Sequence, residues 1–225
     1  MITFDKVSKK FPLGNIAIDE VSFEINDNEF VFLVGPSGAG KTTILKLILK
    51  EISPSSGTIV VDEVDVTDKK IALLEKLRQK IGIVFQDFKI LPDKTVFENV
   101  ALGLQILGAK SSEIKKEVKE ALTLVGLSGK EKVFPVQLSA GELQRVSIAR
   151  AVVGDRKIIL ADEPTGNLDP KTSWEIIKIF KKLEGKRTII IATHNTDVVN
   201  SLQKRVIVIK AGKIIKDVRK GGYEL

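Results

Sequence analysis

The chain has 225 residues, of which 43% are hydrophobic and 29% are charged, a composition typical of a soluble globular protein with one core. It contains no cysteine, which excludes a disulfide framework and a thiolate zinc site. The net charge is +7, but basic and acidic residues are mixed in segments such as SEIKKEVKEALTLVG, so we expect no nucleic-acid partner.

The first residues, MITFDKVSKKF, alternate like a strand and lack the apolar centre of a signal peptide. No apolar run approaches the roughly 20 residues that a membrane-spanning helix requires. We therefore expect a cytoplasmic protein.

Two kinds of strand pattern follow each other along the chain. The first third alternates apolar and polar residues in ITFDKVSKKF, VSFEIN and GTIVVDEVDVT, which predicts antiparallel strands joined by turns. Three later runs are continuously apolar, as is typical of parallel strands buried on both faces: FVFLVG (30–35), KIILAD (157–162) and TIIIATH (188–194). Helical patterns follow these runs, so we expect an α/β core that binds ligands at the carboxyl ends of its strands.

We expect residues 1–225 to form one domain that contains an inserted subdomain. Residues 1–87 and 157–225 are predicted to form the α/β core with the antiparallel strands, and residues 88–156 a mostly helical subdomain. Near the end, RVIVIKAGKIIKDV predicts a hairpin that turns at Ala211 and Gly212.

The segment GPSGAGKT, which begins at Gly35, matches G-x-x-x-x-G-K-[ST] between a predicted strand and TILKLILKE, a predicted helix. Glycines let successive backbone N–H groups turn toward phosphate oxygens, and the helix N-terminus adds positive potential. Lys41 supplies a charge for the outer phosphates, and Thr42 offers a hydroxyl to Mg²⁺. The predicted phosphate loop comprises Gly35, Pro36, Ser37, Gly38, Ala39, Gly40, Lys41, Thr42 and Thr43.

Two carboxylates and the only histidine follow the other two buried runs. Asp162 ends KIILAD, where it can hold Mg²⁺ through water, and the adjacent Glu163 can orient or deprotonate an attacking water. Adjacent carboxylates alone are more typical of a solvated loop, but a neighbouring phosphate loop favours a catalytic pair. His194 ends TIIIATH at the same edge, where it can contact the γ-phosphate or the water.

The stretch LSAGELQR contains Ser139 and Glu142 three residues apart, a spacing that predicts a capping box at a helix start. Gly141 then falls in the first helical turn, where glycine costs about 1 kcal/mol relative to alanine. The capping box leaves this glycine unexplained. One reason for it would be an anion pressed against the backbone.

Taken together, these motifs resemble the ATP-binding-cassette (ABC) ATPase family over essentially the whole chain. GPSGAGKT resembles its phosphate loop, VFQD its Q-loop, LSAGELQR its signature motif, ILADEP its Walker B segment, NLD its D-loop and His194 its switch histidine. The resemblance implies an ABC nucleotide-binding domain of α/β class, with a RecA-like P-loop core, an N-terminal antiparallel β subdomain and an inserted helical subdomain. It also implies ATP and Mg²⁺ as cofactors and hydrolysis of ATP to ADP and phosphate.

The family's site residues map onto this chain motif by motif. Phe11 corresponds to the aromatic that stacks on adenine, although a core phenylalanine is the other interpretation. Two cassettes of this family pack head to tail, so Ser139 and Gly141 would face the ATP of a second copy; Ala140 departs from the family's usual glycine. The implied catalytic residues are Lys41, Gln86, Glu163 and His194, the metal ligands are Thr42, Gln86 and Asp162, and the further nucleotide contacts are Phe11, Ser139, Gly141 and Asp169.

Within the family, the run VFQDFKILPDKTVFENV most resembles the members that act in cell division with a membrane protein. Phe88, Ile90 and Leu91 form an apolar stretch broken by Lys89 and stopped by Pro92, an awkward pattern for a buried helix. We expect an integral membrane partner to dock near Phe88–Pro92 and to hold the chain on the inner face of the membrane. Packing within the helical subdomain is the other interpretation.

Other functions fit parts of the sequence. Family members that drive lipoprotein release or macrolide export share DEPTGNLD and a similar length. A small-molecule P-loop kinase would leave LSAGELQR and His194 without a role. Soluble ABC proteins that act on DNA or ribosomes usually carry a coiled-coil insertion or a second cassette, and this chain has neither.

Overall fold

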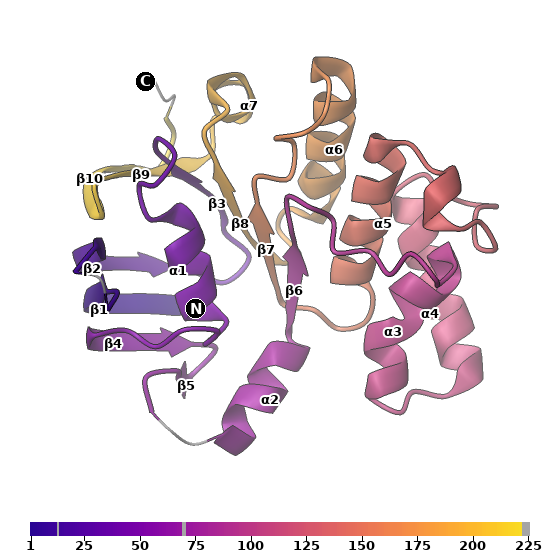
Figure 1. Ribbon diagram of the computed structural model, residues 1–225, viewed down its shortest axis with the longest axis horizontal. Coiled ribbons are helices and arrows are strands. Elements are labelled where there is room, and N and C mark those ends of the chain that lie inside the picture. Colours follow the sequence, from indigo (N-terminus) through magenta and orange to yellow (C-terminus); the bar gives the residue numbers. More distant parts are fainter. Residues whose placement is uncertain (13, 69–70, 222–225) are drawn as a thin grey trace.

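The computed structural model describes residues 1–12, 14–68 and 71–221, and these residues contain two sheets with helices around them (Figure 1). The smaller sheet has the strand order β2-β1-β4-β5 and is antiparallel throughout. Its strands are β1 (Ile2–Lys10), β2 (Ile16–Ile25), β4 (Ser56–Val61) and β5 (Val64–Asp65). The predicted antiparallel strands of the first third are therefore confirmed.

The larger sheet has the strand order β10-β9-β3-β8-β7-β6, and only β10 runs antiparallel to its neighbour in this sheet of the described chain. The three apolar runs are confirmed as parallel strands, and the predicted hairpin is confirmed as β9 and β10. The strands are β3 (Phe30–Val34), β6 (Ile81–Val84), β7 (Ile158–Asp162), β8 (Thr188–Thr193), β9 (Arg205–Lys210) and β10 (Lys213–Val218).

The larger sheet divides two hydrophobic cores, which explains its continuously apolar strands. Along β3, Phe30, Phe32 and Val34 pack into the core on one face, and Val31 and Leu33 pack into the core on the other. The second core continues into the small sheet and α1 (Lys41–Ile48), the helix expected after the phosphate loop. The central strands β3, β7 and β8 are therefore apolar on both faces and not only at alternate positions.

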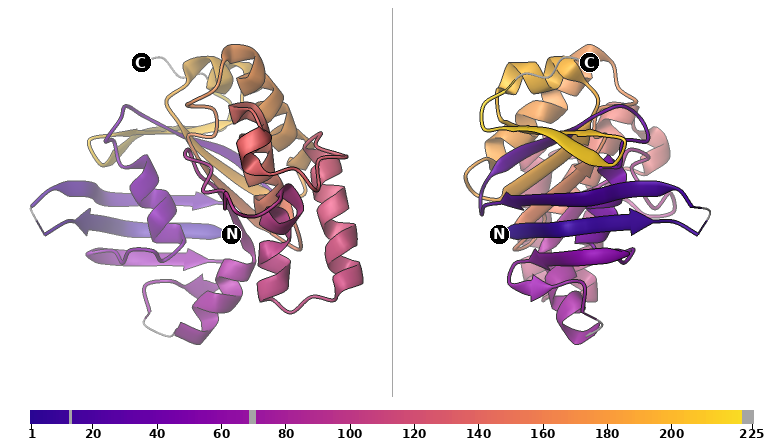
Figure 2. Two further views of the ribbon diagram at one scale, coloured as in Figure 1. Left: turned by 45° about the vertical axis from the view of Figure 1, so that its right-hand side comes forward. Right: turned by 90° about the vertical axis from the view of Figure 1, so that its left-hand side faces the viewer.

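The helices form groups on the two sides of the larger sheet (Figures 1 and 2). Residues 88–156, all described, contain helices and no strand, and Figure 2 shows these helices on the side of the molecule away from the small sheet. Their limits as a subdomain stay a prediction, because α5 also packs against β6 of the core. The remaining bounds are α2 (Ile71–Gln79), α3 (Val96–Ile106), α4 (Ser111–Leu124), a 3₁₀ helix (Pro135–Gln137), α5 (Ala140–Val152), α6 (Pro170–Leu183) and α7 (Thr196–Leu202). In the described chain, every helix is too short or too polar to cross a membrane.

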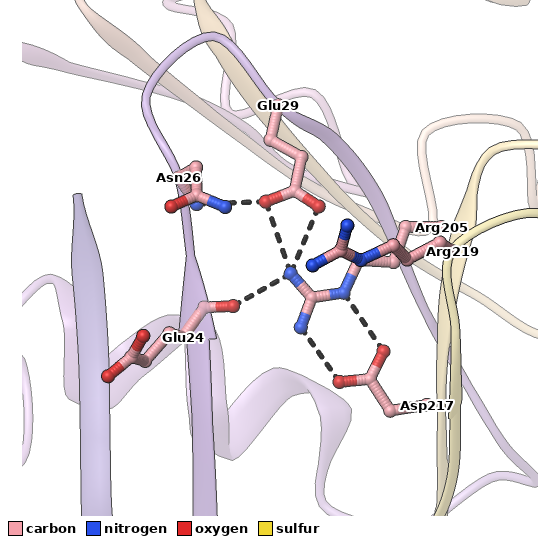
Figure 3. A pocket seen from close by; sticks show the side chains of 6 residues that line it. All are labelled: Glu24, Asn26, Glu29, Arg205, Asp217 and Arg219. Carbon is pink, nitrogen blue, oxygen red and sulfur yellow. Dashed lines mark hydrogen bonds and ion pairs between the residues drawn. The ribbon is translucent and has the colours of Figure 1, made fainter.

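One arginine joins the two sheets at a polar pocket (Figure 3). Arg205, at the start of β9, donates hydrogen bonds to both carboxylate oxygens of Asp217, to both of Glu29 and to the Glu24 carbonyl. The hydrogen bonds that Arg205 donates to Asp217 and Glu29 raise the pKa of Arg205 above its usual value. The ion pairs connect β9 and β10 to the segment between β2 and β3.

We expect Arg205→Leu to lower the free energy of unfolding by about 3 kcal/mol, because it leaves the half-buried Glu29 carboxylate and the more exposed Asp217 carboxylate without their cation. Urea unfolding monitored by circular dichroism measures the change. Arg219→Leu is the matched control: Arg219 lines the same pocket but forms no ion pair with another described residue, so its effect should stay within about 0.5 kcal/mol. Equal effects of the two variants would contradict a structural role for the Arg205 ion pairs.

Candidate nucleotide-binding site

The phosphate loop lies between the end of β3 and the start of α1, at the carboxyl edge of the parallel strands. Gly40 caps α1 with φ 113°, and a Cβ at this position would lie 2.6 Å from the Ala17 carbonyl oxygen of β2. A Cβ at Gly35 would lie 2.1 Å from the carbonyl oxygen of Ile209 in β9. These glycines therefore also let the loop pack against both sheets, a requirement in addition to the predicted approach of phosphate.

Lys41 and Thr42, the first residues of α1, place their polar groups at the centre of this edge. The Lys41 side chain is buried, and its Nζ donates to the Gly35 carbonyl oxygen at 2.8 Å. The same Nζ lies 3.6 Å from Glu163 Oε1. Thr42 Oγ1 donates to Asp162 Oδ1 at 3.1 Å. The structure thus brings together the predicted residues of β3–α1 and of β7.

Glu163 has an unusual backbone conformation that directs its carboxylate toward the neighbouring strand β8. Its φ is 46°, and strained backbone of this kind is concentrated at functional sites. Oε1 lies 2.8 Å from His194 Nδ1, and Oε2 accepts a hydrogen bond from Thr193 Oγ1 at 3.1 Å. Lysine, histidine and threonine thus hold one carboxylate in place. Thr193 was not among the residues predicted from the sequence, although it ends β8, the strand that His194 follows.

Asp162 and Thr42 form an oxygen-rich pair that fits a magnesium ion. Burial raises the pKa of Asp162, and the adjacent Glu163 charge raises it further, while the hydrogen bond from Thr42 and the Lys41 charge lower it. A cation beside Asp162 would offset the cost of burying its charge. The described residues contain no cluster of three or more metal-binding histidines and carboxylates. One hydroxyl and one carboxylate, completed by phosphate and water oxygens, are typical ligands of Mg²⁺.

Gln86 lies close to the segment that follows Glu163. Its carbonyl oxygen accepts a hydrogen bond from Asn167 Nδ2 at 3.4 Å. A Cβ on Gly166 would lie 3.4 Å from Gln86 Nε2 and 3.6 Å from the Glu163 Cβ. The exposed Gln86 side chain is therefore near the carboxylate with which it is predicted to act, and Gly166 keeps the space between them open.

Phe11 lies in the turn between β1 and β2, with 37% of its surface exposed. The turn is closed by a hydrogen bond from the Phe11 N–H to the Asn15 carbonyl at 2.9 Å, two residues before Ala17, which contacts the phosphate loop. Lys9 Nζ lies 5.3 Å from the centre of the ring. An exposed ring does not fit the core interpretation, and stacking on adenine stays a prediction.

LSAGELQR begins α5 with the predicted capping box. Ser139 Oγ accepts a hydrogen bond from the Glu142 N–H at 3.4 Å, and Glu142 Oε2 accepts one from the Ser139 N–H at 3.0 Å. Gly141 has a reason within the chain that the sequence analysis missed: a Cβ there would lie 2.5 Å from Thr172 Cγ2 of α6. The glycine therefore permits close packing of α5 against α6, and this role does not depend on an anion.

The predicted nucleotide residues do not all lie in one group within a single copy. Asp169 caps α6 and accepts a hydrogen bond from the Thr172 N–H at 3.0 Å. Among the described residues, no hydrogen bond or ion pair joins Ser139 to Lys41 or Glu163, and the Ser139 hydroxyl bonds there to its capping partner Glu142. Among these residues, Ser139 thus has no direct polar contact with Lys41 of the phosphate loop.

The fold and this edge define a P-loop nucleoside-triphosphate-binding protein, with a phosphate loop, a pair of oxygen ligands that fits Mg²⁺ and a carboxylate held by lysine and histidine. The family model described as ABC transporter matches residues 18–166. The chain belongs to the ABC transporter family and is an ATPase of that family, which confirms the family and the activity expected from the sequence.

Known relatives match nearly the full chain. The Cell division ATP-binding protein FtsE of Bacillus subtilis (strain 168) is 48% identical over 224 residues, with 99% of this chain and 98% of the relative covered. The protein of the same name from Mycobacterium tuberculosis (strain H37Rv) is 43% identical, with 99% and 98% covered. A solved structure described as a dimeric, post-hydrolysis state of the ATP-binding cassette MJ0796 bound to ADP and Pi has a TM-score of 0.89 and 35% identity, with 99% and 100% covered. The expected fold class and the likeness to cell-division members are confirmed.

Proposed function

We propose that this chain is the ATP-hydrolysing subunit of a cell-division ABC system and works with an FtsX-like integral membrane partner. The observation that supports ATP hydrolysis best is the carboxylate of Glu163, held between Lys41, His194 and Thr193. Support for the cell-division role comes from relatives named Cell division ATP-binding protein FtsE at 43% and 48% identity over nearly the whole chain. The partner would hold the chain on the inner face of the membrane.

The site residues have distinct roles in this proposal. The phosphate-loop N–H groups and Lys41 bind the outer phosphates, so Lys41 Nζ exchanges the Gly35 carbonyl for phosphate oxygens. Thr42 and Asp162 would hold Mg²⁺, which when bound neutralises charge on the transferred phosphoryl group. Glu163 orients the attacking water and accepts its proton, and His194 holds that carboxylate in place.

We further propose that ATP closes a head-to-tail homodimer. Ser139 forms no hydrogen bond with Lys41 among the described residues, which leaves the start of α5 available to complete the ATP site of a second copy. The N-terminus of α5 would then present its free N–H groups to the γ-phosphate. The MJ0796 cassette, similar over the whole chain, is described as dimeric. Hydrolysis would open the dimer and pass the movement to the membrane partner.

The proposed function is tested by expressing the chain with the membrane protein encoded beside it. We expect the two proteins to co-purify, ATP hydrolysis to increase when the partner is present in lipid vesicles, and depletion of the chain to produce a division defect. Co-purification with a lipoprotein-release or export permease, without a division defect, would overturn the cell-division assignment.

The segment Phe88–Pro92, near which we expect the partner to dock, combines both interpretations of its sequence. Phe88 and Ile90 are half-buried, with Ile90 packed against the helical core, whereas Leu91 is 37% exposed. Asn99 of α3 binds the Leu91 backbone, donating to its carbonyl at 3.0 Å and accepting from its N–H at 2.9 Å. Leu91 is thus the apolar side chain that a rigid loop presents to solvent, and we propose it as the docking contact.

We expect Leu91→Asp to reduce capture of the membrane partner and partner-stimulated hydrolysis about tenfold or more, since a carboxylate would be buried against an apolar surface. ATP affinity and the melting temperature should remain those of the unsubstituted protein. Ile106→Asp is the matched control, because Ile106 is 76% exposed. It is the last residue of α3, about 15 Å along the helix from the first residue, Val96. Equal loss in both variants, or normal capture by Leu91→Asp, would place the docking contact elsewhere.

A further inference from the structure

The turn after Gln86 contains two consecutive residues in the left-handed backbone conformation. Phe88 has φ 60° and Lys89 has φ 48°, and neither is a glycine or an asparagine. Within the turn, the Phe88 N–H donates to the Phe85 carbonyl at 3.3 Å, and the Lys89 N–H lies 2.6 Å from the Asp87 carbonyl. The exposed Lys89 Nζ also forms an ion pair with Asp87 Oδ2 at 2.6 Å. Two strained residues in succession persist only where the surroundings hold them.

Arg150, in the last turn of α5, holds this turn from the other side. Its Nη2 donates to the Phe88 carbonyl at 2.8 Å, and its Nη1 donates to the Lys89 carbonyl at 2.5 Å. The two carbonyls belong to the two left-handed residues. A planar guanidinium binds two neighbouring acceptors through two separate nitrogens in a fixed geometry, whereas a lysine has a single nitrogen and no such planar fork.

The binding of Arg150 to the turn is electrostatically costly. Burial lowers the pKa of Arg150 below its usual value, and no described carboxylate forms an ion pair with it. The cation is satisfied by backbone dipoles alone. Arg150 is half-buried, and a charge that loses part of its hydration without gaining a counter-ion adds little to stability.

The same helix connects to two other parts of the nucleotide site. α5 begins at the capping residue Ser139, about 16 Å along the axis from Arg150. In its second turn, the buried Gln144 donates through Nε2 to the carbonyl of Pro164, the residue after Glu163, at 2.7 Å. One rigid element therefore carries the signature motif, a bond beside the catalytic carboxylate and the guanidinium that holds the turn after Gln86.

We propose that Arg150 is a positioning residue that ties the turn after Gln86 to α5, so that movement of the signature helix on ATP binding is passed to Phe88–Pro92. Arg150 touches neither nucleotide nor metal in this assignment. It acts through the backbone of Phe88 and Lys89, and it determines where Leu91 is presented to the membrane partner. The inference rests on the proposed function, in which ATP state is passed to a partner.

The test is Arg150→Lys, which keeps the charge and removes the two-pronged hydrogen bonding. Arg156→Lys is the matched control, because burial lowers the pKa of Arg156 as well and its guanidinium also donates to backbone carbonyls, those of Gln79 and Val153. Hydrogen exchange of residues 86–92 is measured in the Glu163→Gln background, without nucleotide and with trapped ATP. The difference in exchange between these two states can be measured without the membrane partner. Stimulation of hydrolysis by the membrane protein in vesicles is measured on variants with Glu163 intact.

We expect Arg150→Lys to lose the ATP-dependent change in exchange at residues 86–92 and to lose partner stimulation about tenfold or more, with ATP affinity unchanged within about twofold. Arg156→Lys should keep both. A normal exchange change in Arg150→Lys, or the same loss in both variants, would overturn the assignment. Absence of stimulation in the unsubstituted protein would instead count against the proposed function, while the exchange measurement still decides the role of Arg150.

If Arg150→Lys lowers the melting temperature more than Arg156→Lys, Lys89→Gly is added to it. Glycine adopts the left-handed conformation without strain, so stability should return. The proposal requires that the exchange change and the stimulation stay low, because the connection to α5 is still missing. Their return together with stability would show that Arg150 only stabilises the turn.

Discussion

Glu163→Gln should slow ATP hydrolysis about 100-fold or more while ATP affinity stays within about twofold of the unsubstituted protein. An amide has the shape of the carboxylate but accepts no proton from water, and it cannot pair with Lys41 Nζ, which lies 3.6 Å from Glu163 Oε1. The contact with His194 can persist through the amide, so the site should keep its shape. ATP would then remain bound, and an ATP-dependent dimer should be easier to isolate.

Phosphate release in the steady state and titration with a fluorescent ATP analogue measure the two effects separately. Thr193→Val is the matched comparison, because it keeps the volume and removes the hydroxyl that donates to Glu163 Oε2 at 3.1 Å. We expect it to slow hydrolysis about tenfold, since the base stays in place but is less firmly oriented. Near-normal turnover of Glu163→Gln would remove Glu163 from the mechanism.

The parts of the fold that sequence predicted correctly depend on local patterns. The three apolar runs could be identified as parallel strands because their alternate residues fill two cores, as Phe32 and Leu33 do. β6 was missed because it has four residues and an internal glycine. A Cβ on Gly82 would lie 1.8 Å from the Ala151 carbonyl of α5, a contact with a helix remote in sequence. Such contacts leave no periodic signal.

In the candidate site, too, residues in local patterns could be predicted and contacts between distant segments could not. Lys41 could be singled out because it completes the phosphate-loop motif. Asp162, Glu163 and His194 could be singled out because they lie where buried strands end, and strand ends meet at one edge of a parallel sheet. The partners of Arg150 could not be predicted, because a basic residue near the end of a helix gives no indication that it binds distant backbone carbonyls. The packing of Gly141 against α6 could likewise not be predicted, because it is a contact between two helices. Mutation can separate this packing role from contact with an anion.

Gly141→Asp should leave ATP affinity of the monomer within about twofold and abolish ATP-dependent dimerisation, because the new carboxylate would face the γ-phosphate held by a second copy. Variants that alter only the packing of α5 against α6 control for local disruption of the structure. Gly141→Ala adds only the Cβ that would lie 2.5 Å from Thr172 Cγ2, and Thr172→Ser removes that methyl group. If packing is the only role of Gly141, Thr172→Ser should restore dimerisation to both Gly141 variants. If the glycine also contacts phosphate, Thr172→Ser should restore dimerisation to Gly141→Ala and leave Gly141→Asp unable to dimerise.

Mixing two inactive variants then tests the second copy directly. Lys41→Ala lacks the phosphate-binding ammonium and Gly141→Asp lacks a usable signature motif, so neither should form a closed dimer alone. In a heterodimer of the two, one site combines the intact Lys41 of one copy with the intact Gly141 of the other, and the second site carries both defects. We expect hydrolysis to return to at most about half of the unsubstituted rate at equal mixing, measured by phosphate release, and dimers to reappear in gel filtration with ATP. No recovery, together with weak ATP binding by the Gly141→Asp monomer, would mean that the glycine serves α5–α6 packing within one chain and that the ATP site is not shared between copies.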